Sequence, residues 1–289
     1  METMRPNDRA SRRPVAGRPL DLAGFPGTWI NANPQTTGIA RLEVELKDGT
    51  PSVRAIAVGP DGLLAWGTAE TTGVYTFGPE SPVGAGFSLR YDFGFLESLV
   101  HANLNKGLMV LSIYSRYRDG SNRPDYFIRE YFAVTHSRYF HFQNAEDSGA
   151  VPLTPALRYA CATDCRFDGR PVLDPGPILG RWLNTNPRST GFAEVVIARE
   201  GERLIVRARG AGEGGAAERV TEGIVLANIE EEDKISNVAL LALFDLGSME
   251  IQMQLRFNKE LLVAALFSAY REDGGRFDHF SRDFFHRAV

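Results

Sequence analysis

The sequence predicts an all-β protein built from two tandem antiparallel β-barrels, and three observations support this fold class. Apolar and polar residues alternate with period two along short segments. Gly, Pro, Asn and Asp separate these segments at near-regular spacing, and no segment has the period of a convincing amphipathic helix. One block of sequence also occurs twice at a constant spacing, which predicts two copies of one domain.

The internal repeat is the clearest of these signals. GTWINANPQTTGIA returns later in the chain as GRWLNTNPRSTGFA, so that Trp29 and Trp182 lie 153 residues apart. The same spacing relates YDFG to FDLG, and it relates Arg129 near the end of the first copy to Arg282 near the end of the second. A spacing that stays constant over a whole domain indicates an internal duplication.

The repeat divides the chain into four parts. Residues 1–21 form a basic arm that carries arginines and prolines but almost no apolar residues, and we expect it to be disordered. Residues 22–143 are the first barrel repeat, and residues 175–289 are the second. Between them, residues 144–174 contain several prolines and turn-forming residues, as expected of a linker.

Short strands joined by turns are expected throughout each copy. In the first copy the alternation is clearest over residues 39–46, and a turn at Asp48-Gly49 leads to a strand at 53–57. The further strands are expected at 63–69, 73–78, 85–93, 97–104, 108–118 and 124–133. The second copy repeats this pattern, with a more loop-like segment at 211–223 and a solvated acidic turn at Glu230–Asp233. About eight strands close into a barrel that holds side chains or one small ligand.

Composition excludes several classes of protein. The net charge of −4 argues against a general nucleic-acid binder, which needs a basic face. No apolar run reaches the roughly 18 residues of a membrane helix, and no apolar segment follows the N-terminal arginines as it would in a signal peptide. The Arg-rich start is also compatible with an organellar transit peptide. Two cysteines do not make the disulfide framework of a small secreted domain, so we expect a cytoplasmic protein.

No metal or cofactor is expected. Cys161 and Cys165 lack a second pair of ligands, so a local disulfide or two free thiols is the interpretation. The histidine pairs have spacings that match no zinc motif, and we interpret them as surface or hydrogen-bonded residues: His136 and His141, and His279 and His286. The glycine-rich GAGEGG lacks the Lys-Ser/Thr of a phosphate loop and is interpreted as a flexible hairpin.

Each copy opens with a G-x-W triplet, around Trp29 and Trp182, and closes with a strand that carries Arg129 or Arg282. This combination resembles the lipocalin/calycin superfamily, and the resemblance implies that each tryptophan closes a barrel floor with the arginine packed across it. The longer string W-x-N-x-N-P-x-[TS]-T-G is similar to that of a largely uncharacterised family of bacterial β-barrel proteins. The lipocalin disulfide and a secretion signal are absent. Duplicated calycin barrels also occur in cofactor-free hydratases and pericyclic cyclases of natural-product and carotenoid pathways, and the resemblance implies a similar activity here.

Residues shared by both copies are interpreted as structural, because each copy needs the same turn, cap or buried pair. Ion pairs are expected between Asp92 and Arg129 and, in the second copy, between Asp245 and Arg282. The shared residues are Trp29/Trp182, Asn33-Pro34/Asn186-Pro187, Gly38/Gly191, Asp92/Asp245 and Arg129/Arg282.

Function is sought where the copies differ. At the repeat spacing, four polar residues of the first copy correspond to apolar or neutral ones of the second: Arg90 to Leu243, His101 to Gln254, Tyr114 to Phe267 and Arg116 to Ala269. If these side chains face the interior of the barrel, Tyr114 is a proton donor, and Arg116 and Arg90 polarise a carbonyl or bind a carboxylate. The binding candidates are Asp92, His101, Trp66, Tyr75 and Tyr91. The alternative is that this face is solvent, or the surface where the two barrels meet.

The leading functional hypothesis is a cofactor-independent isomerase, cyclase or hydratase that acts on an apolar small molecule inside one barrel. The alternative is a non-catalytic, lipocalin-like binder or carrier of such a molecule, and a structural interaction module is a third reading. The expected partner is therefore an apolar small molecule, without nucleic acid and without a membrane span. The sequence specifies neither the substrate nor the oligomeric state.

Overall fold

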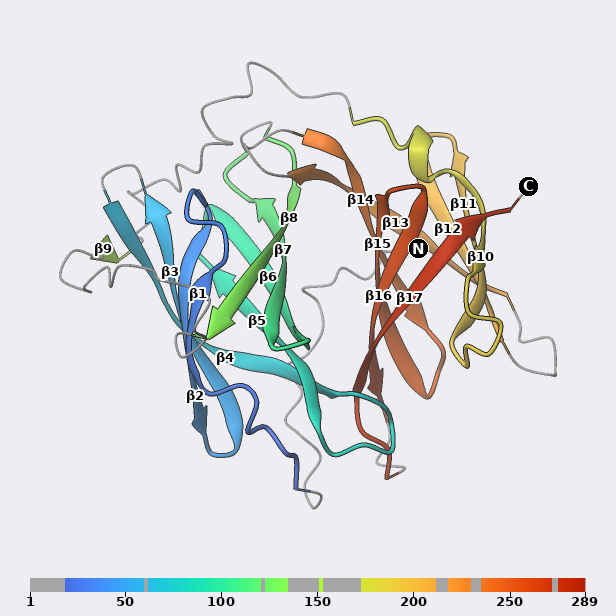
Figure 1. Ribbon diagram of the computed structural model, residues 1–289. Helices are drawn as coiled ribbons and strands as arrows, with labels where there is room; N and C mark the ends of the chain where they lie inside the picture. Colours follow the sequence, from blue (N-terminus) through green and yellow to red (C-terminus); the bar gives the residue numbers. More distant parts are fainter. Residues whose placement is uncertain are drawn as a thin grey trace.

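The computed structural model of the chain describes residues 19–59, 62–120, 123–134, 151–152, 173–211, 218–229, 235–271 and 275–288. Within these ranges every regular element is a β-strand, apart from the short 3-10 helix η3 (Gly176–Ile178) (Figure 1). The prediction of an all-β protein is confirmed. In this part of the chain no helix is long and apolar enough to span a membrane.

Eight strands of the first half pair in sequence order, each antiparallel to the next. β1 pairs with β2 on one side and with β8 on the other, so that Trp29 lies opposite both Leu42 and Val134 and the ladder closes. We call this closed ring the first barrel. Its strands are β1 (Gly27–Asn31), β2 (Ile39–Lys47), β3 (Thr50–Gly59), β4 (Gly62–Thr76), β5 (Gly84–Asp92), β6 (Leu96–Asn105), β7 (Leu108–Tyr117) and β8 (Tyr126–Val134).

The second half closes in the same way, because β10 pairs with both β11 and β17. We call it the second barrel. Its strands are β10 (Gly180–Asn184), β11 (Phe192–Glu200), β12 (Arg203–Gly210), β13 (Arg219–Ile229), β14 (Ile235–Asp245), β15 (Met249–Asn258), β16 (Leu261–Tyr270) and β17 (His279–Arg287). A two-residue strand, β9 (Val151–Pro152), pairs in parallel with β4. The repeat extends to the strand boundaries, since Gly27 and Gly180 begin the first strands and Leu108 and Leu261 begin the seventh.

Two details of the expected strand pattern are wrong. The segments 63–69 and 73–78 are one strand, β4, because β-bulges near Gly67 and Gly73 bend the chain without ending the ladder. The loop expected at 211–223 is shorter, since β13 already begins at Arg219. Most of the basic arm, most of the linker, both cysteines, His136, His141 and the acidic turn lie outside the described residues.

The interior of each barrel is packed with large apolar side chains. Trp29 and Trp182 are buried, and their indole N–H groups donate to the carbonyl oxygens of Phe25 and Ile178, each at 2.9 Å. Both barrels therefore contain the same hydrogen bond between the tryptophan and the carbonyl oxygen four residues before it. The expectation that Arg129 and Arg282 pack across the tryptophans is wrong, because both arginines point away from the barrel interiors, in which Phe132 and Phe285 lie three residues further along the strands. At Trp182 the side chain over the ring is that of Arg287, with its guanidinium carbon 4.4 Å from the ring centroid.

The two barrels contact each other through equivalent strands in exchanged roles. The start of β8 pairs in parallel with the end of β13, where Tyr126 lies opposite Ala227. The start of β17 meets the end of β4, where His279 lies opposite Thr76. Since β13 and β17 are the counterparts of β4 and β8, the barrels are related by an approximate two-fold arrangement, which can be followed in Figure 1.

Candidate functional site

Tyr114 lies on the outer face of the first barrel, so the expectation that it faces the interior is wrong. In β7, Leu111 and Ile113 point into the barrel core, and Tyr114 therefore points away from it, as side chains of a strand alternate. Tyr114 is only 6% exposed, because it packs in a cluster that includes Leu226 and Leu241 of the second barrel. The alternative interpretation, that this face is where the barrels meet, is confirmed for Tyr114.

Two of the expected binding residues also lie between the barrels. The His101 ring is 4.4 Å from the ring of Phe267, and the Tyr75 ring is 5.0 Å from the same ring. Trp66 and Tyr91 instead belong to the interior of the first barrel, where their rings lie 5.3 Å apart. The five binding candidates are therefore not one pocket.

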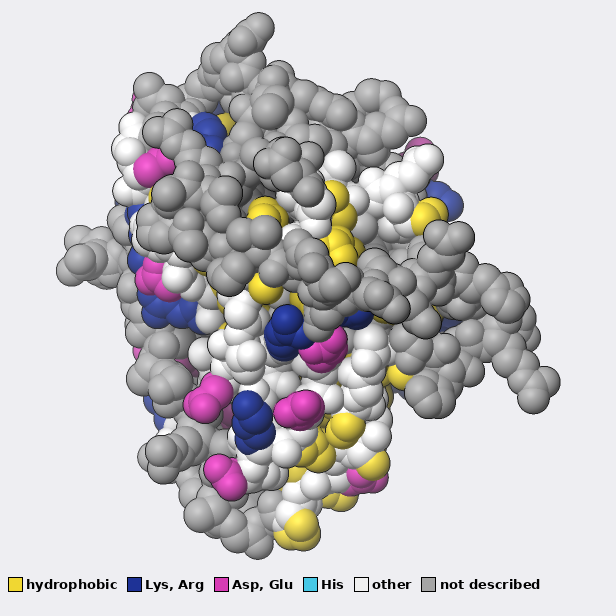
Figure 2. Space-filling view, turned by 90° about the vertical axis from the view of Figure 1, so that its left-hand side faces the viewer, with side chains coloured by type: hydrophobic (Ala, Val, Ile, Leu, Met, Phe, Trp, Pro, Cys, Tyr) yellow, Lys and Arg dark blue, Asp and Glu magenta, His cyan; other side chains and the backbone are white. Residues whose placement is uncertain are grey.

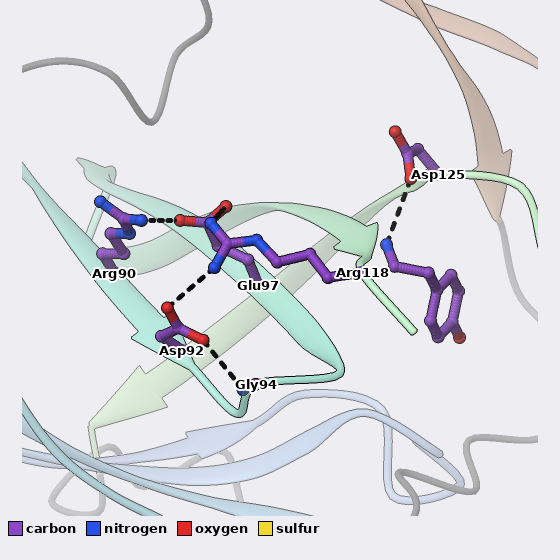
Figure 3. Close-up of polar contacts among 7 residues, drawn as sticks. Arg90, Asp92, Gly94, Glu97, Arg118 and Asp125 are labelled. Atoms are coloured by element: carbon purple, nitrogen blue, oxygen red, sulfur yellow. Dashed lines mark hydrogen bonds and ion pairs between the residues drawn. The ribbon is translucent and has the colours of Figure 1, made fainter. Parts of the chain in front are cut away.

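Arg90 and Asp92 belong to a charged network on the outer surface of the first barrel (Figure 3). Arg118 contacts both Asp92 and the buried Glu97, and Arg90 contacts Glu97 from the other side. The pKa of Asp92 is lowered by the backbone N–H of Gly94, and also by Arg118. The network therefore ties the β5–β6 turn to the end of β7.

The same network recurs in the second barrel, where Arg271 contacts Asp245 at 2.7 Å and Glu250 at 2.9 Å. The expectation that Asp92 pairs with Arg129 and Asp245 with Arg282 is therefore wrong, because the partners are Arg118 and Arg271. Asp92 lies at the end of β5, within reach of Arg118 just beyond β7, whereas Arg129 lies in the middle of β8. Repetition in both copies indicates that these contacts stabilise turns.

Arg116 shares the outer face of β7 with Tyr114, and it is half-buried. It lies near the end of the strand, opposite Glu97 of β6. Of the three expected catalytic residues, Tyr114, Arg116 and Arg90, Tyr114 is the one that lines the cleft described next.

A narrow cleft lies where β7 and β8 of the first barrel face β15, β16 and β17 of the second. Its empty volume is about 310 Å³, which includes space open to solvent. Both barrels contribute side chains, and three of these are arginines. The lining residues are Ser112, Tyr114, Phe127, Arg129, Gln254, Leu255, Arg256, Val263, Ala265 and Arg282.

The cleft has an excess of positive charge and of hydrogen-bond donors. The Nε atoms of Arg129, Arg256 and Arg282 are buried without a hydrogen-bond partner, and so is Nε2 of Gln254. In the part of the chain that the structure describes, no carboxylate lines the cleft and no ion pair joins these arginines to a carboxylate. The pKa of Arg129 is lowered to about 10, first by burial and then by the charge of Arg256.

Tyr114 completes this donor set. Burial raises the pKa of its phenol well above the usual 10, while the charges of Arg129 and Arg256 act in the opposite direction. Because burial is the larger effect, the hydroxyl keeps its proton at neutral pH. The phenol is therefore a hydrogen-bond donor at this site.

The positive charge comes from one difference between the copies. Arg282 donates from Nη2 to Oδ1 of Asn103 at 3.1 Å. The counterpart of Asn103 at the repeat spacing is Arg256, so that Arg129, the counterpart of Arg282, has a second cation as its neighbour. The sequence alone does not single out these arginines, because Arg129 and Arg282 recur in both copies and are interpreted as structural. The same comparison of the two copies that singled out Tyr114 also contains the difference between Asn103 and Arg256.

The opposite side of the first barrel contrasts with the cleft. Figure 2 shows this side, which carries β1–β3, and its basic and acidic side chains are interspersed. Glu43, for example, contacts both Arg41 and Arg54. On the part of this surface that Figure 2 shows uncovered, basic and acidic side chains thus accompany each other, in contrast to the lining of the cleft.

A second unusual group is the buried carboxyl of Glu130 inside the first barrel. It accepts hydrogen bonds from Nδ2 of Asn31 at 2.9 Å and from Oγ1 of Thr36 at 2.5 Å. A Cβ atom on Gly38 would lie 2.7 Å from the same carboxyl. Burial raises the pKa of Glu130 to about 7. The N-x-N-P-x-[TS]-T-G string therefore recurs because it wraps a loop around an acidic group, which is Asp283 in the second copy.

The described residues contain no group of three or more side chains suited to holding a metal ion. No protein-family model matches the sequence, and no curated protein matches it either. The cleft and its arginines therefore carry the functional argument by themselves.

Proposed function

We propose that this chain binds a small organic anion in the cleft between its two barrels. The observation that carries the proposal is a set of three half-buried arginines, Arg129, Arg256 and Arg282, whose Nε atoms are buried without a hydrogen-bond partner and whose charges no carboxylate of the described residues balances. Like charges held together out of water destabilise a protein unless a counter-charge is present. Guanidinium groups match carboxylate and phosphate oxygens in both charge and geometry. A bound anion would supply the acceptors that these donors lack.

We further infer that the two barrels are calycin-like and arose by internal duplication. The repeated strand boundaries, the two tryptophan contacts and the two Asp–Arg–Glu networks support this inference. Under this reading the site is a product of the joined halves, since neither copy alone contains all three arginines. Large side chains such as Phe87, Tyr91 and Phe132 occupy the interior of the first barrel, which favours the cleft over a lumen as the ligand site.

An enzymatic role is the second candidate, and the position of Tyr114 in the cleft favours it. A protonated phenol beside arginines can donate to an oxyanion that develops on a bound substrate. The reaction classes would be those of a cofactor-independent isomerase, cyclase or hydratase. An enzyme of this kind would need the hydroxyl proton of Tyr114 for its reaction, whereas a carrier would not. In Tyr114→Phe, turnover would be lost if the chain is an enzyme, whereas a carrier would lose only part of its ligand affinity.

The variant Arg256→Asn tests the anion site directly. It gives Arg129 the partner that Arg282 has in Asn103, so the melting temperature without ligand should rise. Inorganic phosphate, added at constant ionic strength against a chloride reference, should raise the melting temperature of the wild type and should not raise that of the variant.

Arg188→Asn is the matched control, because it removes the same charge from an exposed turn. It should respond to phosphate as the wild type does. Equal responses of the wild type and Arg256→Asn would contradict the proposal, as would a wild type that responds to phosphate no more than to chloride.

A further inference from the structure

We propose that the ligand of this cleft has a doubly charged oxyanion head joined to a flat aromatic or apolar body. This inference rests on the proposed function and adds the chemical class of the ligand. The head is argued from the charges inside the cleft, and the body from two exposed aromatic side chains beside it.

The charges of the cleft favour a dianion. Three guanidinium groups line it, and none of the described residues that line it is acidic. A single carboxylate would leave two of the three cations uncompensated in a partly buried site, whereas a phosphate monoester or a dicarboxylate would leave one. The oxygens of a phosphate can also accept from several donors at once, and Nε of each arginine and Nε2 of Gln254 have none to donate to.

Tyr131 and Phe284 are the two aromatic side chains that mark the rim. Each follows an arginine of the cleft by two residues in its strand, so each lies on the same outward face as that arginine. They occupy equivalent positions in the two copies, and they are 40% and 42% exposed. Large aromatic side chains with this exposure offer a surface on which a flat ligand group can pack.

Contacts connect both side chains to the cleft. The guanidinium carbon of Arg129 is 5.4 Å from the Tyr131 ring centroid. Tyr131 therefore lies beside an arginine that lines the cleft. Phe284 lies opposite Val263 across the β16–β17 ladder, and Val263 lines the cleft. A head held by the arginines would thus leave the body of the ligand at these rings.

The size of the cleft agrees with this division. Its empty volume of about 310 Å³ includes space open to solvent, so the enclosed part is too small to take up a whole hydrophobic molecule. The lining also differs in character from the rim, since the donors are buried and the two aromatic side chains are exposed. The ligand would therefore enter with its charged end first.

Calorimetric titration of the full chain tests the proposal with three probes, namely inorganic phosphate, phenyl phosphate and benzoate. Phenyl phosphate should bind about tenfold more tightly than inorganic phosphate, because its ring gains an aromatic contact. Benzoate should bind more weakly than phenyl phosphate, because it has one charge. The double variant Tyr131→Ala/Phe284→Ala should lose the advantage of phenyl phosphate and keep the affinity for inorganic phosphate.

Phe77→Ala is the control, since Phe77 is an exposed aromatic residue outside the cleft lining and its loss should change nothing. Equal affinities for the two phosphates, unchanged in the rim variant, would refute the aromatic body and leave the anion site intact. Tighter binding of benzoate would refute the doubly charged head. Tighter binding of a phosphotyrosine peptide than of phenyl phosphate would assign the site to a macromolecule instead. If no probe binds the wild type better than Arg256→Asn, the anion site itself is wrong.

Discussion

Replacing Glu130 by Gln should remove a large part of the pH dependence of this protein's stability. The Glu130 carboxyl is buried, its hydrogen bonds come from neutral groups such as Asn31 and Thr36, and no cation appears among the causes of its shifted pKa. Burial raises that pKa to about 7, from an ordinary value of 4.5. Glutamine has nearly the same shape and keeps an oxygen that Asn31 and Thr36 can donate to, but it does not ionise.

The direction of the effect follows from proton linkage. Between pH 4.5 and pH 7 the folded protein holds a proton on Glu130 that the unfolded chain has released. Stability therefore falls as pH rises through this range, and the contribution is constant below and above it. The interval from 4.5 to about 7 corresponds to about 3 kcal/mol, at about 1.4 kcal/mol for each pKa unit.

Urea denaturation at pH 5 and at pH 8 measures this effect. From pH 5 to pH 8 the free energy of unfolding of the wild type should fall by about 3 kcal/mol more than that of Glu130→Gln. The measured difference is smaller than this by the part of the titration that occurs below pH 5. Asp283→Asn is the matched variant in the second barrel, and its effect should have the same sign and a smaller size, because Asp283 is less buried and its pKa is also raised by burial. Equal losses in the wild type and Glu130→Gln would refute the reasoning, since the carboxyl would then titrate as it does in the unfolded chain.

Three further outcomes are expected. Trp182→Ala should lower the free energy of unfolding by about 3–5 kcal/mol in urea, because Trp182 is fully buried; an unchanged midpoint would contradict its place in the core. Arg287→Ala should lower the free energy of unfolding by about 1–2 kcal/mol, because it removes the contact with the Trp182 ring and the hydrogen bonds to the carbonyl oxygens of Leu179 and Pro177. Val134 holds the equivalent position in the first copy, so Val134→Ala is the comparison variant. A smaller loss of stability in Arg287→Ala than in Val134→Ala would argue against the stacked arginine. Tyr114→Phe should change the free energy of unfolding by less than about 1 kcal/mol while weakening phosphate binding in calorimetry, and unchanged affinity would remove the phenol from the site.

The charged network and the Glu130 loop show which recurring residues of the repeat have a structural role. A residue pair that recurs at the repeat spacing, such as Asp92–Arg118 and Asp245–Arg271, performs the same structural task in both copies. Arg129 and Arg282 also recur, but the surface between the barrels gives them different neighbours. Recurrence therefore indicates a structural role only for residues whose partners lie in the same copy.

The amino-acid sequence was enough to predict an all-β protein, most of its strands and turns, and the recurrence of one strand pattern in the two halves of the chain. These features depend on local chemistry, namely the period-two alternation of side chains and the turn residues, and on the repeated string around Trp29 and Trp182. The same alternation placed Tyr114 and Arg116 on one face of β7, which the strand geometry requires.

Which face of each strand is the interior, and what covers the other face, depends on how the two barrels pack in three dimensions. β6 and β7 are buried on both faces, because the second barrel packs against their outer side, so alternation alone did not reveal the direction of Tyr114. The cleft itself joins residues more than a hundred positions apart, such as Arg129 and Arg256. No local pattern records such a pairing, because it arises from the packing of two closed surfaces against each other.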